Sequence, residues 1–142
     1  MKKLILIAIA AAFFARANAQ VIEVKAVPGP VITSFQSAYP AVTKVEWRKV
    51  GDDYVAVYYQ DQNDMYVTYD PSGKVVEYRE GVAYTTVPEP AITYVKTKYK
   101  GDKITKVYKI KDSKGTVMYK GRVRDTYLLF DSNGNFIREV KD

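Results

Sequence analysis

The sequence contains no histidine and no cysteine among its 142 residues. Without them the chain cannot form a Ser-His-Asp triad, a Cys-His nucleophile, a thiol redox motif or the usual zinc and haem sites. Disulfide bonds are also excluded, so packing alone must stabilise the fold. No glycine-rich phosphate loop or dinucleotide-binding fingerprint is present. These absences exclude most common enzyme classes, and we expect no cofactor and no bound metal.

Paired carboxylates are the remaining route to acid–base catalysis, as in glycoside hydrolases. The candidate pairs are Asp52 with Asp53 and Asp61 with Asp64. Both pairs fall in short polar segments between predicted strands, where aspartate is typical of a solvated turn. We therefore expect no catalytic residue and predict that the protein is not an enzyme.

Long apolar runs are confined to the N-terminus. Two lysines precede an apolar run over residues 4–14, and the small-x-small sequence Ala17-Asn18-Ala19 follows it. The run is well short of the roughly 20 apolar residues of a membrane span, and no cysteine follows to carry a lipid. Residues 1–19 are predicted to be a signal peptide cleaved near Ala19, which makes the protein periplasmic or secreted without a stable membrane anchor.

The positive charge becomes modest once this segment is removed. The full chain has 22 basic and 16 acidic residues, a net charge of +6, and the signal peptide carries three of the basic ones. The remaining basic residues are interleaved with acidic ones, whereas nucleic-acid-binding proteins usually concentrate them in a stripe. We expect no nucleic-acid partner, although a mildly positive face could attract an acidic one.

One segment of the sequence is repeated sixty residues further along the chain. VPGPVITSFQSAYP at 27–40 returns as VPEPAITYVKTKYK at 87–100, with Val, two Pro, Ile, Thr and Tyr at matching positions. The second proline of each copy suits the first position of a helix, where its missing N–H has no partner to lose. Apolar residues three and four positions apart follow it. Each copy is therefore predicted to open with a helix of about ten residues, which needs a sheet to pack on.

Each predicted helix is followed by runs rich in β-branched and aromatic residues, separated by short turns. The predicted strands are 42–50, 54–59, 65–69 and 74–78 in the first copy, and 104–110, 116–123, 127–130 and 136–140 in the second. Such short connections permit only antiparallel hairpins. The predicted fold class is α+β, a tandem repeat of a helix plus a four-stranded antiparallel meander. The repeats, 20–86 and 87–142, form one open sheet with two helices on one face.

The last turn of each repeat has the same pattern, Asp-x-x-Gly. Asp70 is followed by Gly73, and Asp131 by Gly134. An aspartate at the first position caps a turn, and glycine takes the positive φ angle that follows. The alternative is a calcium loop, but calcium needs about six oxygen ligands, and Pro71 supplies no side-chain oxygen in the first copy. The pattern favours a hairpin turn.

Thirteen tyrosines make the chain rich in a residue that combines a large ring with a polar hydroxyl. Period-two alternation indicates which face of the sheet each one occupies. In 54–58 the two valines are expected to face the helices and the tyrosines to face away, and Tyr66 is expected to do the same between Met65 and Val67. In 117–123 the valines and Tyr119 are the expected inner set. The predicted partner-binding residues on the outer face are Tyr54, Tyr58, Tyr66, Met118, Lys120 and Arg122.

Two interpretations of this aromatic face stay open. Tyrosine and arginine are frequent in binding hot spots, but cross-strand aromatic pairs also stabilise a solvated sheet. Trp47, the single tryptophan, could lie in the core or on the binding face, and its strand favours the core.

The landmarks in order are the signal peptide, Phe35-x-x-x-Tyr39-Pro40, Val45-Glu46-Trp47, the Asp70 turn, Val87-Pro88 and the Asp131 turn. With them the chain resembles the PepSY-like, beta-lactamase-inhibitor-like proteins exported by Bacteroidetes, over essentially the whole mature length. The resemblance implies the tandem fold described above with an open sheet. In the inhibitor that lends the family its name, the concave sheet face grips an enzyme through aromatic side chains, and PepSY domains are associated with restraining peptidases. No inhibitory motif falls on particular residues of this chain.

The leading functional hypothesis is a non-enzymatic exported binding protein that inhibits or restrains an envelope enzyme through its exposed aromatic sheet face. The alternative is a module of the cell envelope that senses a peptide or a small ligand. A third hypothesis is self-association through the same face or a sheet edge. We expect a protein or peptide partner in the cell envelope, and we expect the chain itself to be monomeric.

Overall fold

The computed structural model describes residues 19–141, and the predicted signal peptide lies almost wholly outside them. These residues form one antiparallel sheet in which the nine strands follow one another in chain order. The strands are β1 (Gln20–Ile22), β2 (Glu46–Val50), β3 (Asp53–Gln60), β4 (Asn63–Tyr69), β5 (Val75–Val82), β6 (Lys106–Asp112), β7 (Val117–Val123), β8 (Thr126–Asp131) and β9 (Phe136–Val140). The helices are α1 (Gly29–Ala38) and α2 (Glu89–Lys98), each preceded by a short 3-10 helix, η2 (Val24–Ala26) or η3 (Tyr84–Thr86). The predicted fold class is confirmed.

The ninth strand is β1, which the sequence analysis did not predict. It pairs with β2 in the same register in which the end of β5 pairs with β6: Gln20 faces Lys49 as Glu80 faces Lys109, sixty residues on. Strand β5 therefore ends the first repeat and begins the second. Because β5 belongs to both repeats, the division into 20–86 and 87–142 stays a prediction.

The two helices are those that the repeated sequences predict, but each begins one residue earlier, at Gly29 or Glu89, so that the second proline stands at the second helical position. Proline occupies the first turn of each, where a missing N–H costs no hydrogen bond. Each helix stops at a tyrosine: the N–H of Tyr39 donates to the carbonyl of Phe35, and that of Tyr99 to the carbonyl of Val95, both at 2.8 Å.

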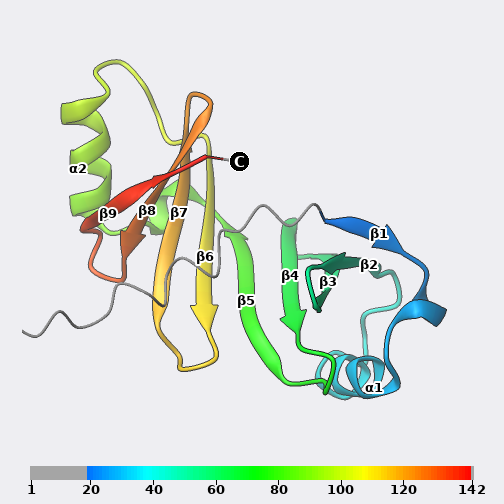
Figure 1. The fold of residues 1–142 in the computed structure, drawn as a ribbon. Helices are drawn as coiled ribbons and strands as arrows, with labels where there is room; N and C mark the ends of the chain where they lie inside the picture. The colour runs from blue at the N-terminus through cyan, green and yellow to red at the C-terminus, as the bar shows by residue number, and fades with distance from the viewer. Residues whose placement is uncertain (1–18, 142) are drawn as a thin grey trace, which may run out of the picture.

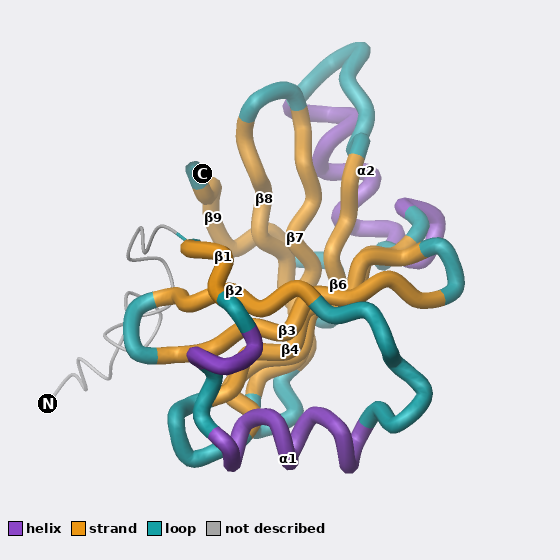
Figure 2. Tube along the Cα trace, turned by 90° about the vertical axis from the view of Figure 1, so that its right-hand side faces the viewer, coloured by secondary structure: helices purple, strands orange, loops and turns teal. Residues whose placement is uncertain are grey.

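Both helices cover the same face of the sheet, which bends strongly along its length. In Figure 1, β6–β9 stand on the left with α2 at their outer side, and β1–β4 stand on the right with α1 beneath. In Figure 2, β6–β8 run nearly upright whereas β1–β4 run across the view, with both helices on the outer side of the bend. The face without helices is therefore concave.

The core beneath α1 contains three of the side chains whose position was uncertain or mispredicted. Trp47 is buried there and packs edge-on against Phe35, with ring centroids 5.5 Å apart. Tyr58 also meets Phe35, at 5.6 Å, and only 4% of it is exposed. Tyr54 packs partly buried against the same cluster. The interpretation of Trp47 as a core residue is confirmed, and the outward orientation predicted for Tyr54 and Tyr58 is wrong.

The error concerns the phase of one strand and has a steric cause. Ala56 lies in the middle of a row with Trp47 and Val67, and it is fully buried. A small side chain at the centre leaves room for the large rings around it to meet the helix. Both alternating sets of β3 are apolar, so alternation alone could not decide between them. The tyrosine rings of β3 face α1 because they bury more apolar area there than the valines would.

The core beneath α2 follows the prediction. Val123 is fully buried in this cluster and Tyr119 packs against it. The other buried members are Val87, Ala91, Val95, Ile104, Val107, Leu128 and Phe130. Met118, Lys120 and Arg122 alternate with the inner residues of β7, so they occupy the concave face as expected.

The two Asp-x-x-Gly segments are hairpin turns that dock against the helix starts. One oxygen of Asp131 accepts the backbone N–H groups of Asn133 and Asn135, both at 2.9 Å, and the other accepts the side-chain amide of Asn135. Asp70 caps its own turn in the same way. Since both carboxylate oxygens of Asp131 accept N–H groups, the geometry is that of the predicted turn.

These caps make folding stability sensitive to acid. Hydrogen bonds from Ser72 and Lys74 lower the pKa of Asp70, and those from Asn135 and Asn133 lower the pKa of Asp131. A carboxyl whose pKa is lower in the folded state stabilises the protein above its unfolded pKa, and this stability is lost as the pH falls through the folded pKa. The double variant Asp70→Asn/Asp131→Asn keeps an oxygen for each turn but cannot titrate there.

We therefore expect urea unfolding to show a smaller loss of stability between pH 6 and pH 2 for the double variant than for the unmodified protein. The remaining carboxyl groups titrate in both proteins, so they do not affect the comparison. Equal losses in the two proteins would contradict the assignment.

Candidate binding surface on the concave sheet face

The concave face is formed by alternate residues of neighbouring strands. One row crosses the junction of the two repeats: Tyr66 on β4 faces Arg79 on β5, Arg79 faces Ile110 on β6, and Ile110 faces Met118 on β7. This row brings side chains that are far apart in sequence onto one surface. No helix of residues 19–141 lies on this side of the sheet (Figures 1 and 2).

A compact group of large side chains occupies the centre of this face, and we call it the concave cluster. Its buried members are Tyr108, Ile110, Tyr127, Leu129 and Val140, with Tyr66 and Met118 partly buried against them. They come from five strands, β4 and β6 to β9. The bend of the sheet turns these strands toward one another, so the cluster packs without a helix over it.

Arg79 joins the two repeats within this face. Its guanidinium carbon lies 5.7 Å from the ring centroids of both Tyr66 and Tyr108. The two rings meet edge to face at 5.9 Å, and Arg79 also pairs with Glu77 at 3.1 Å. A cation over aromatic rings is held by their negative faces. Arg79 is therefore fixed in place with part of its surface still accessible.

Two lysines of the second repeat also lie over tyrosine rings of the concave face. The ammonium of Lys106 lies 5.2 Å from the ring of Tyr108 and 3.7 Å from a carboxylate oxygen of Asp64. That of Lys120 lies 4.4 Å from the ring of Tyr127. Hydrogen bonding to Tyr108 raises the pKa of Lys106 above its ordinary value, with the charge of Asp64 contributing in the same direction. Lys106 thus keeps its charge throughout the physiological range.

Four of the six predicted site residues come together on this face: Tyr66, Met118, Lys120 and Arg122. Lys120 is buried rather than solvated, whereas Arg122 is exposed and donates its Nε–H to the carbonyl of Arg124 at 3.2 Å. Tyr54 and Tyr58 lie on the opposite face beneath α1. Whether the four residues bind a partner stays a prediction.

Sequence reasoning missed Arg79, Tyr108 and Tyr127. Tyr108 could have been found, because it alternates with Ile110 along β6 in the pattern of a half-buried strand. Tyr127 begins the continuous apolar run Tyr-Leu-Leu-Phe, in which period-two alternation cannot assign a face. Arg79 sits in a charged strand and joins the face only through cross-strand pairing.

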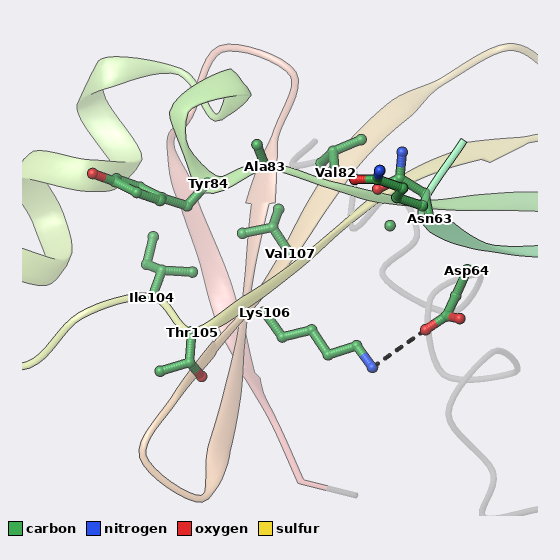
Figure 3. Close-up of a pocket in the computed structure, with 11 residues that line it drawn as sticks. Asn63, Asp64, Val82, Ala83, Tyr84, Ile104, Thr105, Lys106 and Val107 are labelled. Atoms are coloured by element: carbon green, nitrogen blue, oxygen red, sulfur yellow. Dashed lines mark ion pairs between the residues drawn. The ribbon is translucent and has the colours of Figure 1, made fainter. Parts of the chain in front are cut away.

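A small cavity of about 270 Å³ lies at the junction of the repeats, near one end of the concave face. It is lined by Gln62, Asn63, Asp64, Gly81, Val82, Ala83, Tyr84, Ile104, Thr105, Lys106 and Val107. Figure 3 shows Lys106 reaching from the second repeat to Asp64 on the β3–β4 hairpin of the first. The tip of the β3–β4 hairpin thus lies against the start of β6. We call this space the junction cavity.

Within residues 19–141, no three potential metal-ligating side chains from His, Cys, Asp and Glu come together. No helix in this part of the chain is long and apolar enough to cross a membrane. The side chains of the concave face are aromatic rings, aliphatic groups and cations.

The architecture and this face define an open antiparallel sheet with helices on its convex side. The chain belongs to the family described as "Putative beta-lactamase-inhibitor-like, PepSY-like", whose model matches residues 15–77 and 52–138. The two matches agree with the tandem repeat. No curated protein matches the chain.

Solved structures from Bacteroides share the fold at low sequence identity. A protein of B. eggerthii described as "putative periplasmic" is similar with a TM-score of 0.73 and 16% identity, over 80% of this chain and 87% of that one. A DUF2874 family protein of B. uniformis is similar with a TM-score of 0.71 and 22% identity, over 79% of this chain and 87% of that one. A BLIP-like protein of B. fragilis is similar with a TM-score of 0.65 and 18% identity, over 79% of this chain and 84% of that one. These similarities establish the fold alone.

Proposed function

We propose that this chain is a non-enzymatic binding protein, exported after cleavage near Ala19, that restrains an envelope enzyme by holding an acidic segment of it on the concave face. The observation that carries the proposal is the concave cluster with its cations placed over tyrosine rings. Aromatic and arginine side chains fixed by packing lose little entropy on binding, which favours recognition.

Charge selects the chemistry of the partner. Around the concave cluster, strands β5 to β9 place five cations on this face: Arg79, Lys106, Lys120, Arg122 and Arg138. Glu77 pairs with Arg79 and Asp64 with Lys106, and Asp112 and Asp131 cap turns at its edge. The exposed Arg122 lies on the same face as the partly exposed Tyr66 and Met118. Such a surface complements a segment that combines carboxylates with apolar groups.

The test is affinity capture from the envelope fraction of the producing organism. The variant Met118→Asp/Arg122→Glu reverses charge on the concave face, and Lys109→Glu is its control, since Lys109 is an exposed residue of β6 on the helix-covered face. We expect the double variant to lose at least about tenfold in affinity for the captured protein. The control should retain its affinity, and binding should weaken at high salt.

The captured protein is then assayed as an enzyme with and without the unmodified chain. Inhibition that the double variant fails to produce would support the restraining function. Equal capture by the double variant and the unmodified protein, with both variants folded, would refute binding through this face.

A further inference from the structure

A second open groove lies at the opposite end of the first repeat, at strand β1. A groove of about 600 Å³ is bounded there by residues 21–25 and by 45–47, and Trp47 forms part of it. We call it the β1 groove. Strand β1 ends the sheet, so its outer edge pairs with no strand of residues 19–141. Val21 and Val24 are 62% and 61% exposed beside it.

The internal repeat shows what such a groove accommodates. Residues 22–24 and 45–47 correspond, sixty positions on, to 82–84 and 105–107, which line the junction cavity. In the second repeat the β3–β4 hairpin forms one wall of that cavity. Met65 pairs with Glu80, and a Cβ on Gly81 would lie only 3.4 Å from the carbonyl oxygen of Asp64.

We propose that the β1 groove binds an extended strand or hairpin of another protein, which adds antiparallel to β1 as the β3–β4 hairpin adds to the end of β5. Unpaired sheet edges bind strands readily because their backbone N–H and C=O groups have no partner. The exposed Val21 and Val24 would supply the apolar contacts of this interface. The surface is separate from the concave cluster.

Charge specifies one property of the incoming strand. In the second repeat, Lys106 pairs with Asp64 of the hairpin at 3.7 Å. The residue sixty positions before Lys106 is Glu46, which lines the β1 groove. Glu46 pairs with Arg48 on its own strand, yet its side chain stays 46% exposed. The occupant should therefore carry a basic residue where the hairpin carries Asp64.

The same comparison argues against a second copy of this chain as the occupant. In the second repeat the residue equivalent to Asp64 is Asp125, since Tyr66 faces Arg79 as Tyr127 faces Val140, 61 residues on. A head-to-tail contact would place Asp125 against Glu46. Like charges in such a contact are unfavourable.

The experiment uses peptides that copy the chain's own hairpin. Two cyclised peptides span residues 59–69, one with the natural sequence and one with Asp64→Lys. The emission of Trp47, the protein's single tryptophan, reports binding to the purified protein because neither peptide contains tryptophan. We expect the Asp64→Lys peptide to bind about two- to fivefold more tightly than the natural one, the range of an exposed ion pair.

A charge reversal in the protein completes the test. In Glu46→Lys the preference should invert, so that the natural peptide binds more tightly. Val24→Ser should weaken both peptides, whereas Val75→Ser, an exposed valine outside the groove, should not. NMR amide shifts should map to β1 and the start of β2.

Three results would overturn the proposal: no binding of either peptide up to millimolar concentration, an affinity insensitive to the charge at position 46, or shifts that map to the concave cluster. Concentration-dependent dimerisation by light scattering that Val24→Ser abolishes would assign the groove to a second copy instead.

Discussion

Replacing Gly73 by alanine should lower the free energy of unfolding by about 3 kcal/mol. Gly73 has a φ of +88°, and a Cβ built there would lie 2.5 Å from the carbonyl oxygen of Pro30 in the first turn of α1. The cost combines a left-handed backbone carrying a side chain with a collision against backbone that cannot move without displacing the helix. Urea unfolding followed by circular dichroism measures it.

Gly115→Ala is the matched control. Gly115 ends a turn of the same kind, with Asp112 as its cap and a φ of +83°. Its added Cβ would meet nothing closer than the flexible end of Lys111, 4.0 Å away. In this variant the free energy of unfolding should fall by only about 1 kcal/mol, the cost of placing an alanine in a left-handed backbone conformation. If the two variants lost equal stability, the close docking of the turn on α1 would be refuted.

Tyr58→Ala should lower the free energy of unfolding by about 3–5 kcal/mol, the usual cost of deleting a buried aromatic ring. The ring of Tyr58 packs against Phe35 and, at 5.3 Å, against Tyr39, so its removal leaves a cavity directly beneath α1. Tyr58→Phe keeps the ring and should stay within about 1 kcal/mol of the unmodified protein. Urea unfolding distinguishes the two variants.

Tyr66→Ala provides the comparison from the other face of the sheet. Tyr66 is only partly buried, so the substitution should cost less than half as much stability as Tyr58→Ala while weakening capture of the concave-face partner. A folded Tyr58→Ala protein of unchanged stability would contradict the placement of this ring in the core.

Much of the fold could be predicted because its signals are local and repeated. Proline at the first turn of each helix, aspartate and glycine at the hairpin turns, and apolar runs of strand length each specify one element. The sixty-residue repeat then indicates that whatever one half forms the other half forms too. Strand β1 escaped prediction because three residues carry too little periodicity to be recognised.

The candidate site could be predicted only where alternation was unambiguous. Met65 and Val67 flank Tyr66 with apolar groups on both sides, so the face of the sheet on which Tyr66 lies was predicted correctly. In β3 every residue from Tyr54 to Tyr58 is apolar or aromatic, so the pattern allowed two opposite phases. Arg79 joined the surface through strand pairing, which no local pattern reveals.

By itself, then, the amino-acid sequence determined both α-helices and eight of the nine described strands, their order and their antiparallel connection, since these depend on backbone conformation and on short turns. Only the tertiary structure decided which rings lie beneath the helices and which form the concave cluster. That choice depends on how side chains of different size fill the space between α1 and the sheet, where Ala56 makes room for Trp47 and Tyr58. It depends equally on the bend that gathers five strands around Tyr108 and Tyr127, and both are properties of the packed molecule as a whole.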